Sequence, residues 1–205
     1  RKFYLFALVA VLCGLEGSKS LDGSLFLNQR NGENVLLCIS CLQQLGRAEP
    51  QAIYWSFITA RAKMLSMPTK GPEDLALARL LCLTRCSDKD LADYLTRSWR
   101  SLLPEDRVVL TDYLLADGIR EPAIVFEYLP NFLANSKNNS IIGLHHALIL
   151  LVDLVVWLRE NLAEDISMGV TCIANLSDVA NFVEKVHCFK VFEALSWHLL
   201  LEEGT

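Results

Sequence analysis

Apolar residues recur every three or four positions along most of the chain, and short polar linkers separate the apolar stretches. This spacing is typical of amphipathic helices that bury one face. Strand signals are scarce, because no convincing alternating run is bounded by a tight hairpin turn. The pattern predicts helices near residues 2–15, 33–46, 50–66, 72–85, 88–102, 105–116, 122–135, 140–162, 177–187 and 189–203.

The linkers between these helices are short, with two exceptions. Segment 16–32 is polar and contains glycine, which predicts a longer loop. Segment 163–176 is ambiguous and has room for one short helix. Short linkers predict that successive helices pack as antiparallel neighbours. We therefore expect an all-α fold in a single domain, residues 1–205.

Proline and acidic residues mark the positions where several helices are expected to begin. Proline favours the first helical position, because that position needs no backbone N–H and suits the fixed φ angle of proline. Acidic side chains favour the first turn, because they interact well with the positive end of the helix dipole. Ser87, with Asp90 three residues later, resembles a capping box and predicts an N-cap at Ser87. Proline-led starts are expected at Pro50, Pro72, Pro104 and Pro122.

The expected helix pairs recur at intervals of roughly 30 to 40 residues, as stacked helical hairpins do. In this pattern the chain is similar to degenerate armadillo and HEAT α-solenoids, although no residue signature repeats at a fixed period. The resemblance implies about nine to ten helices packed as consecutive antiparallel hairpins, in a scaffold that binds protein partners. A compact helical bundle around a buried central helix is the alternative fold.

Residues 1–15 join two basic residues to an apolar run, which is typical both of a signal peptide and of a buried helix. N-glycosylation sequons at Asn138 and Asn175 favour export. The poor cleavage site and the odd number of cysteines, seven, favour a structural helix. We expect the structural helix, in an intracellular fragment of a larger protein. The alternative is a secreted or lumenal helical protein that loses residues 1–20.

Residues 141–162 form the most hydrophobic stretch, and Asp153 lies within it. A membrane span needs about 20 apolar residues, and a carboxylate in lipid costs a few kcal/mol. We therefore expect a helix buried in the protein core and no membrane insertion, so that Asp153 needs a partner or an opening to solvent. A membrane-associated protein that uses residues 3–15 or 141–158 is a second alternative.

Two close pairs of cysteines occur, in the segments CISC and CLTRC. Two such pairs are able to form a four-thiolate zinc site. Both pairs, however, lie within amphipathic helix patterns, where a thiol behaves as a small apolar side chain. We expect core packing, with zinc binding as the alternative, for Cys38, Cys41, Cys82 and Cys86.

No group of residues follows a catalytic or cofactor-binding pattern, since G-x-x-x-x-G-K, G-x-G-x-x-G and G-x-S-x-G do not occur. The adjacent His145 and His146 point about 100° apart on a helix, so they do not readily bind one ion together. His187 and His198 share a face only if one helix continues through both. We therefore expect no catalytic, cofactor-binding or metal-binding residue, no cofactor and no enzymatic activity.

The net charge is −5, and residues 108–205 carry five basic against thirteen acidic residues. No stretch clusters Lys and Arg, so we do not expect nucleic acid as a direct partner. The sequence instead predicts a non-catalytic segment that binds protein partners within an intracellular scaffold. The expected anchors, in the core or in a groove, are Trp55, Trp99, Trp157 and Trp197.

Overall fold

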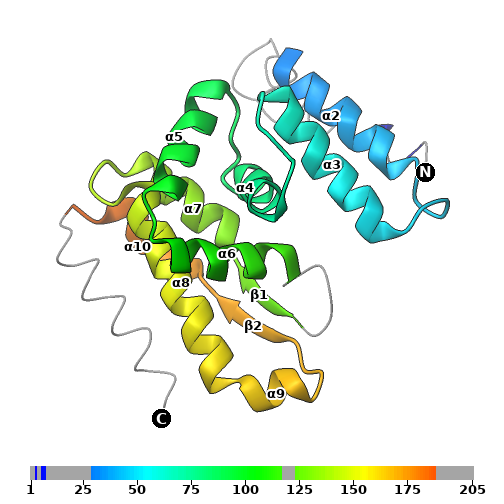
Figure 1. The fold of residues 1–205 in the computed structure, drawn as a ribbon. Helices are drawn as coiled ribbons and strands as arrows, with labels where there is room; N and C mark the ends of the chain where they lie inside the picture. The colour runs from blue at the N-terminus through cyan, green and yellow to red at the C-terminus, as the bar shows by residue number, and fades with distance from the viewer. Residues whose placement is uncertain (1–2, 4–5, 8–28, 117–122, 188–205) are drawn as a thin grey trace. The chain divides into compact units, whose positions relative to one another are not determined.

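The computed structural model describes residues 29–116 and 123–187, together with residues 3, 6 and 7. The described residues are mainly helical, which confirms the all-α prediction in broad terms, and one small sheet is the exception (Figure 1). The contacts within the chain divide it into two compact units, residues 1–61 and 62–205.

Several predictions concern segments outside the described residues. These are the helix at 189–203, most of the helix at 2–15 and the larger part of the loop at 16–32. His198 and Trp197 also belong to this part of the chain. The end of the predicted loop differs from expectation, because residues 29–32 already belong to the first helix described below.

The first unit contains α2 (Gln29–Leu42) and most of α3 (Pro50–Met64). Nη1 of Arg61, on the last turns of α3, donates a hydrogen bond to Oδ1 of Asn34 near the start of α2. Because the two helices are joined by a short loop, this contact between the beginning of one and the end of the other makes them antiparallel.

The second unit holds the remaining helices and a two-stranded parallel sheet. Its elements, in chain order, are α4 (Pro72–Leu83), α5 (Lys89–Arg100), α6 (Pro104–Ala116), β1 (Ile124–Glu127), α7 (Leu129–Asn138), α8 (Gly143–Asn161), α9 (Ala163–Ser167), β2 (Cys172–Asn175) and α10 (Ser177–Lys185).

Helix α8 lies at the centre of the second unit and contacts α5, α6, α7 and α9. It is the apolar stretch that the sequence assigned to the core, and the structure confirms its burial along most of its length. Helix α4 is the other strongly buried helix, and it contacts α5, α6 and α7. The buried side chains of α4, α5, α6, α7, α8 and α10 form one continuous hydrophobic core.

The sequence rules for helix starts hold at most of the positions where they were applied. Helices α3, α4 and α6 begin at Pro50, Pro72 and Pro104, as predicted. The predicted N-cap at Ser87 is wrong by one residue: the carboxylate of Asp88 accepts the hydrogen bond from the N–H of Leu91, and Ser87 Oγ donates to that same carboxylate. An aspartate N-cap also places a negative charge at the positive end of α5.

The helix predicted at 122–135 is wrong in its first half. Residues Ile124–Glu127 form strand β1, and the following helix, α7, begins only at Leu129. Between the two, Tyr128 adopts a left-handed backbone conformation with φ of 62°, which ends the strand and redirects the chain. The partner of β1 is β2, which lies in the segment where only a short helix was considered, and its register pairs Ile124 with Cys172.

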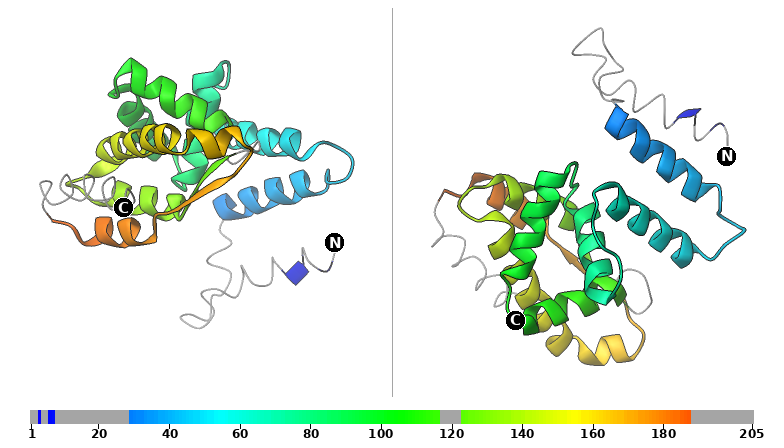
Figure 2. Two further views of the ribbon diagram at one scale, coloured as in Figure 1. Left: turned by 90° about the horizontal axis from the view of Figure 1, so that it is seen from below. Right: turned by 45° about the horizontal axis from the view of Figure 1, so that its top comes forward.

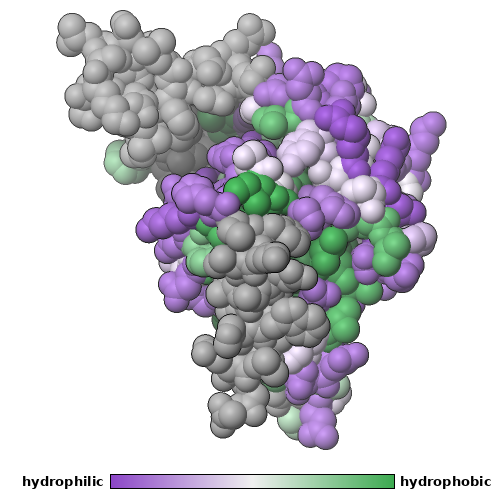
Figure 3. Space-filling view, turned by 90° about the vertical axis from the view of Figure 1, so that its left-hand side faces the viewer, coloured by the Kyte–Doolittle hydropathy of each residue, from purple (hydrophilic) through white to green (hydrophobic). Residues whose placement is uncertain are grey.

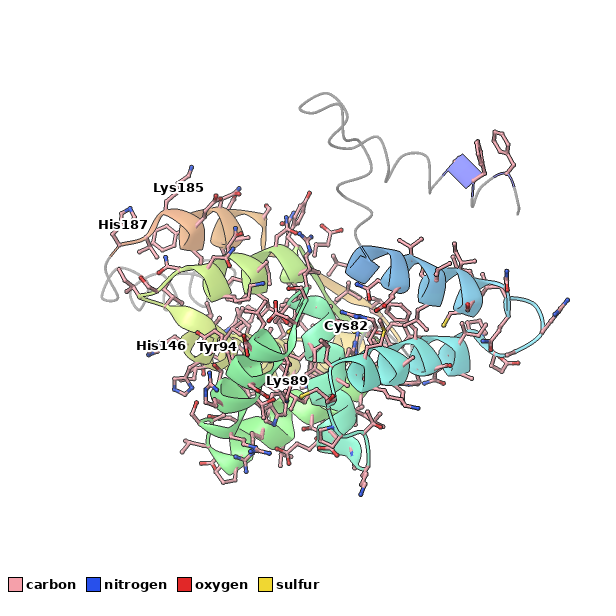
Figure 4. The ribbon with its side chains drawn as sticks, turned by 90° about the horizontal axis from the view of Figure 1, so that it is seen from above. Cys82, Lys89, Tyr94, His146, Lys185 and His187 are labelled. Atoms are coloured by element: carbon pink, nitrogen blue, oxygen red, sulfur yellow. The ribbon has the colours of Figure 1, made fainter. Side chains whose placement is uncertain are left out.

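The start of α8 is fixed against α5 by a close contact at Gly143. The hydroxyl of Tyr94 on α5 accepts a hydrogen bond from the N–H of Leu144 at 3.2 Å (Figure 4). Gly143 has a φ of +63°, and a Cβ at this position would lie 2.9 Å from Tyr94 Oη. Both the backbone conformation and the limited space beside Tyr94 therefore favour glycine at this position.

Two asparagine side chains hold α10, the helix that follows β2, against α7. Nδ2 of Asn135 donates to the carbonyl of Ala180 at 2.9 Å. Nδ2 of Asn139 donates to the carbonyls of Val183 and Val186 at 2.8 and 2.9 Å, while its Oδ1 accepts from the N–H of Ile141 and of Ile142. The amide of Asn139 thus joins the end of α10 to the loop that leads into α8.

We predict that Asn139→Asp lowers the free energy of unfolding by about 2–4 kcal/mol, because a carboxylate replaces the donor and faces two carbonyl oxygens. The substitution keeps the size of the side chain and its two accepted bonds. The control is Asn138→Asp, which adds the same charge at an exposed neighbouring position and should cost less than about 0.5 kcal/mol. Urea denaturation of both variants measures the difference, and equal losses would contradict the role given to Asn139.

Candidate functional site

Strand β2 has one edge paired with β1 and one edge that is open. The N–H groups of Cys172 and Leu176 donate to the carbonyls of Ala123 and Glu127, so alternate residues of β2 face β1. The N–H and C=O groups of Ile173 and Asn175 therefore point away from β1. Neither backbone N–H has a hydrogen-bond partner in the part of the chain that the structure describes.

Exposed apolar side chains occur on β2 and on the segment that leads into it. Ile173 is 65% exposed, and Met168 and Val170, which precede the strand, are 72% and 48% exposed. These side chains lie on the short segment between α9 and the end of β2, which is drawn with no helix across it in the left view of Figure 2. We call residues 168–175 the β2 edge surface. It combines unpaired backbone polar groups with exposed apolar side chains, which protein surfaces seldom leave uncovered.

One face of the two-stranded sheet is covered by α8. Phe126 and Ala174 are paired in register and contact a small cavity whose other walls include Leu154, Trp157 and Leu158 of α8. The volume of this cavity is about 50 Å³, far below the roughly 300 Å³ at which pockets for small organic ligands begin. Because α8 buries the face with Phe126 and Ala174, the face that carries Glu127 and Ile173 is the one open to solvent.

The chain segment that carries the β2 edge surface is acidic, and Arg159 and Lys185 flank it. Residues 160–184 contain five acidic residues and no Lys, Arg or His. Glu164 on α9 and Asp178 on α10 are exposed before and after the strand, and Glu127 is exposed at the end of β1. A partner on this surface is therefore favoured when it carries positive charge. On another side of the molecule, shown in Figure 3, hydrophobic patches lie between hydrophilic ones.

Residues 28–172 match the model of a family of unknown function, DUF6829. The chain belongs to this family. The match extends from just before α2 to the first residue of β2, so it includes α8 and the first part of the β2 edge surface. No curated protein and no solved structure matches the chain.

The four cysteines considered for zinc in this DUF6829 protein lie in different environments. Cys38 and Cys41 are on α2 in the first unit, where burial and the nearby Cys38 raise the pKa of the Cys41 thiol. A raised pKa disfavours the thiolate, which is the form that binds metal. Cys82 packs against the core of the second unit, and Sγ of Cys86 donates to the carbonyl of Asp88. Within the described residues, no three metal-binding side chains gather at one point.

The rings of His145 and His146 contact each other edge to face, with centroids 5.3 Å apart, but their Nδ1 atoms have different partners. The labelled side chains of Cys82, His146 and His187 lie well apart in Figure 4. Nδ1 of His145 lies 2.8 Å from Oγ of Ser101, and Nδ1 of His146 lies 2.7 Å from the carbonyl of Ile142. The hydroxyl of Ser101 also donates to the carbonyl of Ser98. Because a hydroxyl has one proton to donate, its bond to Ser98 leaves Nδ1 of His145 as the donor in the contact with Ser101.

The tryptophans of the described residues have structural contacts. Trp99 is 1% exposed, and its Nε1 donates to Glu73, which also pairs with Arg107 at 3.2 Å. Trp157 is half-buried beside the small cavity, and Trp55 is half-buried on α3. Of the anchors expected in the core or in a groove, Trp99 lies in the core, whereas the sequence did not single out Ile173 or the other residues of the β2 edge surface. The only signal for them was the strand-forming composition of residues 170–173, which contain Val, Thr and Ile.

Asp153 lies on the side of α8 that is open to solvent, which is one of the two outcomes that the sequence allowed. The surrounding protein nevertheless desolvates the carboxylate in part and raises its pKa, and the negative charge of Asp106 on α6 raises it further. Among the described helices, none is both long and apolar enough to cross a membrane.

We predict that Asp153→Asn raises the unfolding temperature at pH 7 by roughly 1–3 °C, a size suited to a solvent-screened charge. The pKa of Asp153 is higher in the folded state, so proton binding by this carboxyl stabilises the fold. That stabilisation is complete below the unfolded-state pKa and is lost as the pH rises through the folded-state pKa. The gain from Asp153→Asn should therefore shrink as the pH falls and approach zero toward about pH 3, where the carboxyl is mostly protonated in both states.

Thermal unfolding between pH 3 and 8 measures this effect, and Asp112→Asn is the matched control. Asp112 is exposed on α6, so its replacement removes one negative charge elsewhere in the same unit. A gain of the same size and pH dependence in both variants would mean that net charge, rather than the surroundings of Asp153, is responsible.

Proposed function

We propose that this DUF6829 protein is a non-catalytic protein-interaction module, and that it contacts its partner through the β2 edge surface. The observation that carries this proposal is the open edge of β2, where unpaired backbone groups of Ile173 and Asn175 lie beside the exposed Ile173 side chain. An open strand edge is a template for pairing with another chain, and folded proteins leave such an edge uncovered mainly where it is used.

For the architecture of the second unit, we propose the compact bundle around a buried central helix rather than the armadillo or HEAT arrangement. The contacts of α8 with α5 and α6, and of α4 with α6 and α7, join helices that are not successive in the chain. A solenoid of consecutive hairpins places most contacts between successive helices and neighbouring repeats. The α2–α3 pair alone is consistent with either arrangement.

The intracellular setting is likewise a proposal, supported by Cys38, Cys41 and Cys172, which form no disulfide within the described residues. The secreted alternative also has a supporting observation, because Asn138 and Asn175, the acceptors of both sequons, are exposed. The intact mass of the chain from mammalian cells separates the two settings. An unmodified mass supports the intracellular one, and added glycan with a shortened N-terminus supports the secreted one.

The proposed function is tested by photocrosslinking in cells that express the protein, with a photoreactive amino acid at position 173 or at position 108. Val108 is the matched control, because it is an exposed apolar residue on α6, 60% exposed against 65% for Ile173. We expect defined protein adducts from position 173 and background labelling from position 108. Equal labelling at the two positions, or none at 173, would contradict the proposal.

A further inference from the structure

We propose that the partner of the β2 edge surface is an extended, basic peptide segment of another protein, which pairs with β2 as a third strand of the sheet. This inference rests on the proposed function and specifies its partner. It commits to backbone pairing as the source of affinity and to positive charge as the source of selectivity.

The geometry of β2 sets how such a segment would pair. Ile173 and Asn175 present their N–H and C=O groups in the same direction, away from β1, at the spacing of alternate strand residues. An added strand satisfies these groups whatever its side chains are, because the bonds are between backbones. The face that carries Glu127 and Ile173 then offers contacts to alternate side chains of the added strand.

The surrounding charge argues for a basic segment. The exposed carboxylates of Glu164 and Asp178 lie on the helices that precede and follow β2, and Glu127 ends the neighbouring strand. No Lys, Arg or His occurs within residues 160–184 to offset them. Lysine or arginine side chains at the two ends of an added strand would face opposite charges, which steers binding and disfavours acidic segments.

The same charge argues against a second copy of this chain as the occupant. Two copies paired through β2 by a two-fold axis would bring their own Glu164 and Asp178 residues close to one another, with no basic residue in that segment to compensate. Like charges at a contact weaken it. The apolar side chains of Met168, Val170 and Ile173 alone would then have to overcome this repulsion.

The test uses the complete chain and a phage-displayed library of random peptides of about twelve residues, long enough to extend past both ends of the strand. We expect selected peptides to be rich in Lys or Arg around a β-branched centre. A synthetic copy of one such peptide should bind at least about tenfold more tightly than the same peptide with Glu in place of its basic residues. Selection of no peptide, or equal binding of the acidic version, would overturn the proposal.

The site of pairing is read from amide hydrogen exchange measured by NMR with and without the selected peptide. We expect exchange at Ile173 and Asn175 to slow by at least about tenfold on binding, because these amides gain partners. The amides of Cys172 and Leu176, which already pair with β1, should change little. Peptide binding that leaves the amides of Ile173 and Asn175 unprotected would overturn the proposal. Protection of these amides in concentrated protein without peptide would also overturn it, because the occupant of the edge would then be a second copy of this chain.

Two substitutions separate backbone pairing from side-chain contact. Ile173→Pro removes the outward N–H without removing a bond to β1, and we expect it to weaken peptide binding by at least about tenfold. Ile173→Thr keeps that N–H and suits a strand, so its loss should be smaller. If Ile173→Pro does not fold, the peptide is instead N-methylated at one backbone position after another. Weaker binding at alternate positions only would support backbone pairing. The same change in affinity at every position would contradict it.

These outcomes are distinguishable from failure of the proposed function. One outcome is that position 173 gives crosslinks in cells, but basic peptides do not protect the amides of Ile173 and Asn175. The β2 edge surface would then still bind a protein, but strand addition by a basic segment would be excluded. The absence of crosslinks from position 173 would contradict both.

Discussion

The burial of α8 is the constraint on which the rest of the second unit depends. Its buried side chains occupy more than half of the helix circumference and contact three other long helices. Each Leu or Val that is fully removed from water contributes about 1.5–3 kcal/mol, so this single helix supplies a large share of the favourable energy of folding. Its solvent-facing strip holds Asp153, the one charge in the middle of the helix, which explains how an otherwise apolar helix accommodates a carboxylate.

The position of α8 also determines where the sheet lies and which of its faces is free. Leu154, Trp157 and Leu158 cover the side of the strands that carries Phe126 and Ala174. The other side and the outer edge of β2 remain open, and α10 is held by Asn135 and Asn139 of the α7 segment rather than by the strand. The elements next to β2 are therefore held in place without a third strand. A partner is able to pair with the open edge without rearranging the core.

Local sequence rules predicted the helices well, because helix formation depends on residues that are close in the chain. The starts at Pro50, Pro72 and Pro104 follow from proline and the helix dipole, and the burial of α8 follows from its composition. The sheet was not predictable in this way, since β1 and β2 pair in parallel across the whole α7–α8–α9 segment. Such pairing depends on the packing of the intervening helices, which no short window of sequence records.

The candidate site was missed for the same reason. The residues that the sequence singled out, among them Trp99 and the closely spaced cysteines of CISC and CLTRC, pack in or against the protein interior. Ile173 attracts notice only once its strand is seen to lie at the edge of the sheet. The match to DUF6829 covers most of the chain, but the function of this family is unknown, so it gives no activity or partner from which a site could be inferred. The assignment of the β2 edge surface therefore depends on hydrogen-bond directions, exposure and local charge.

The most direct test of this account is the hydrogen exchange of the β2 amides in the protein alone. We predict an alternating pattern, in which the amides of Cys172, Ala174 and Leu176 exchange slowly because they pair with β1, while those of Ile173 and Asn175 exchange rapidly. Uniform protection of all five amides would show that the outer edge is already covered. Uniformly rapid exchange would show that β2 does not pair with β1, and either result would contradict the open edge.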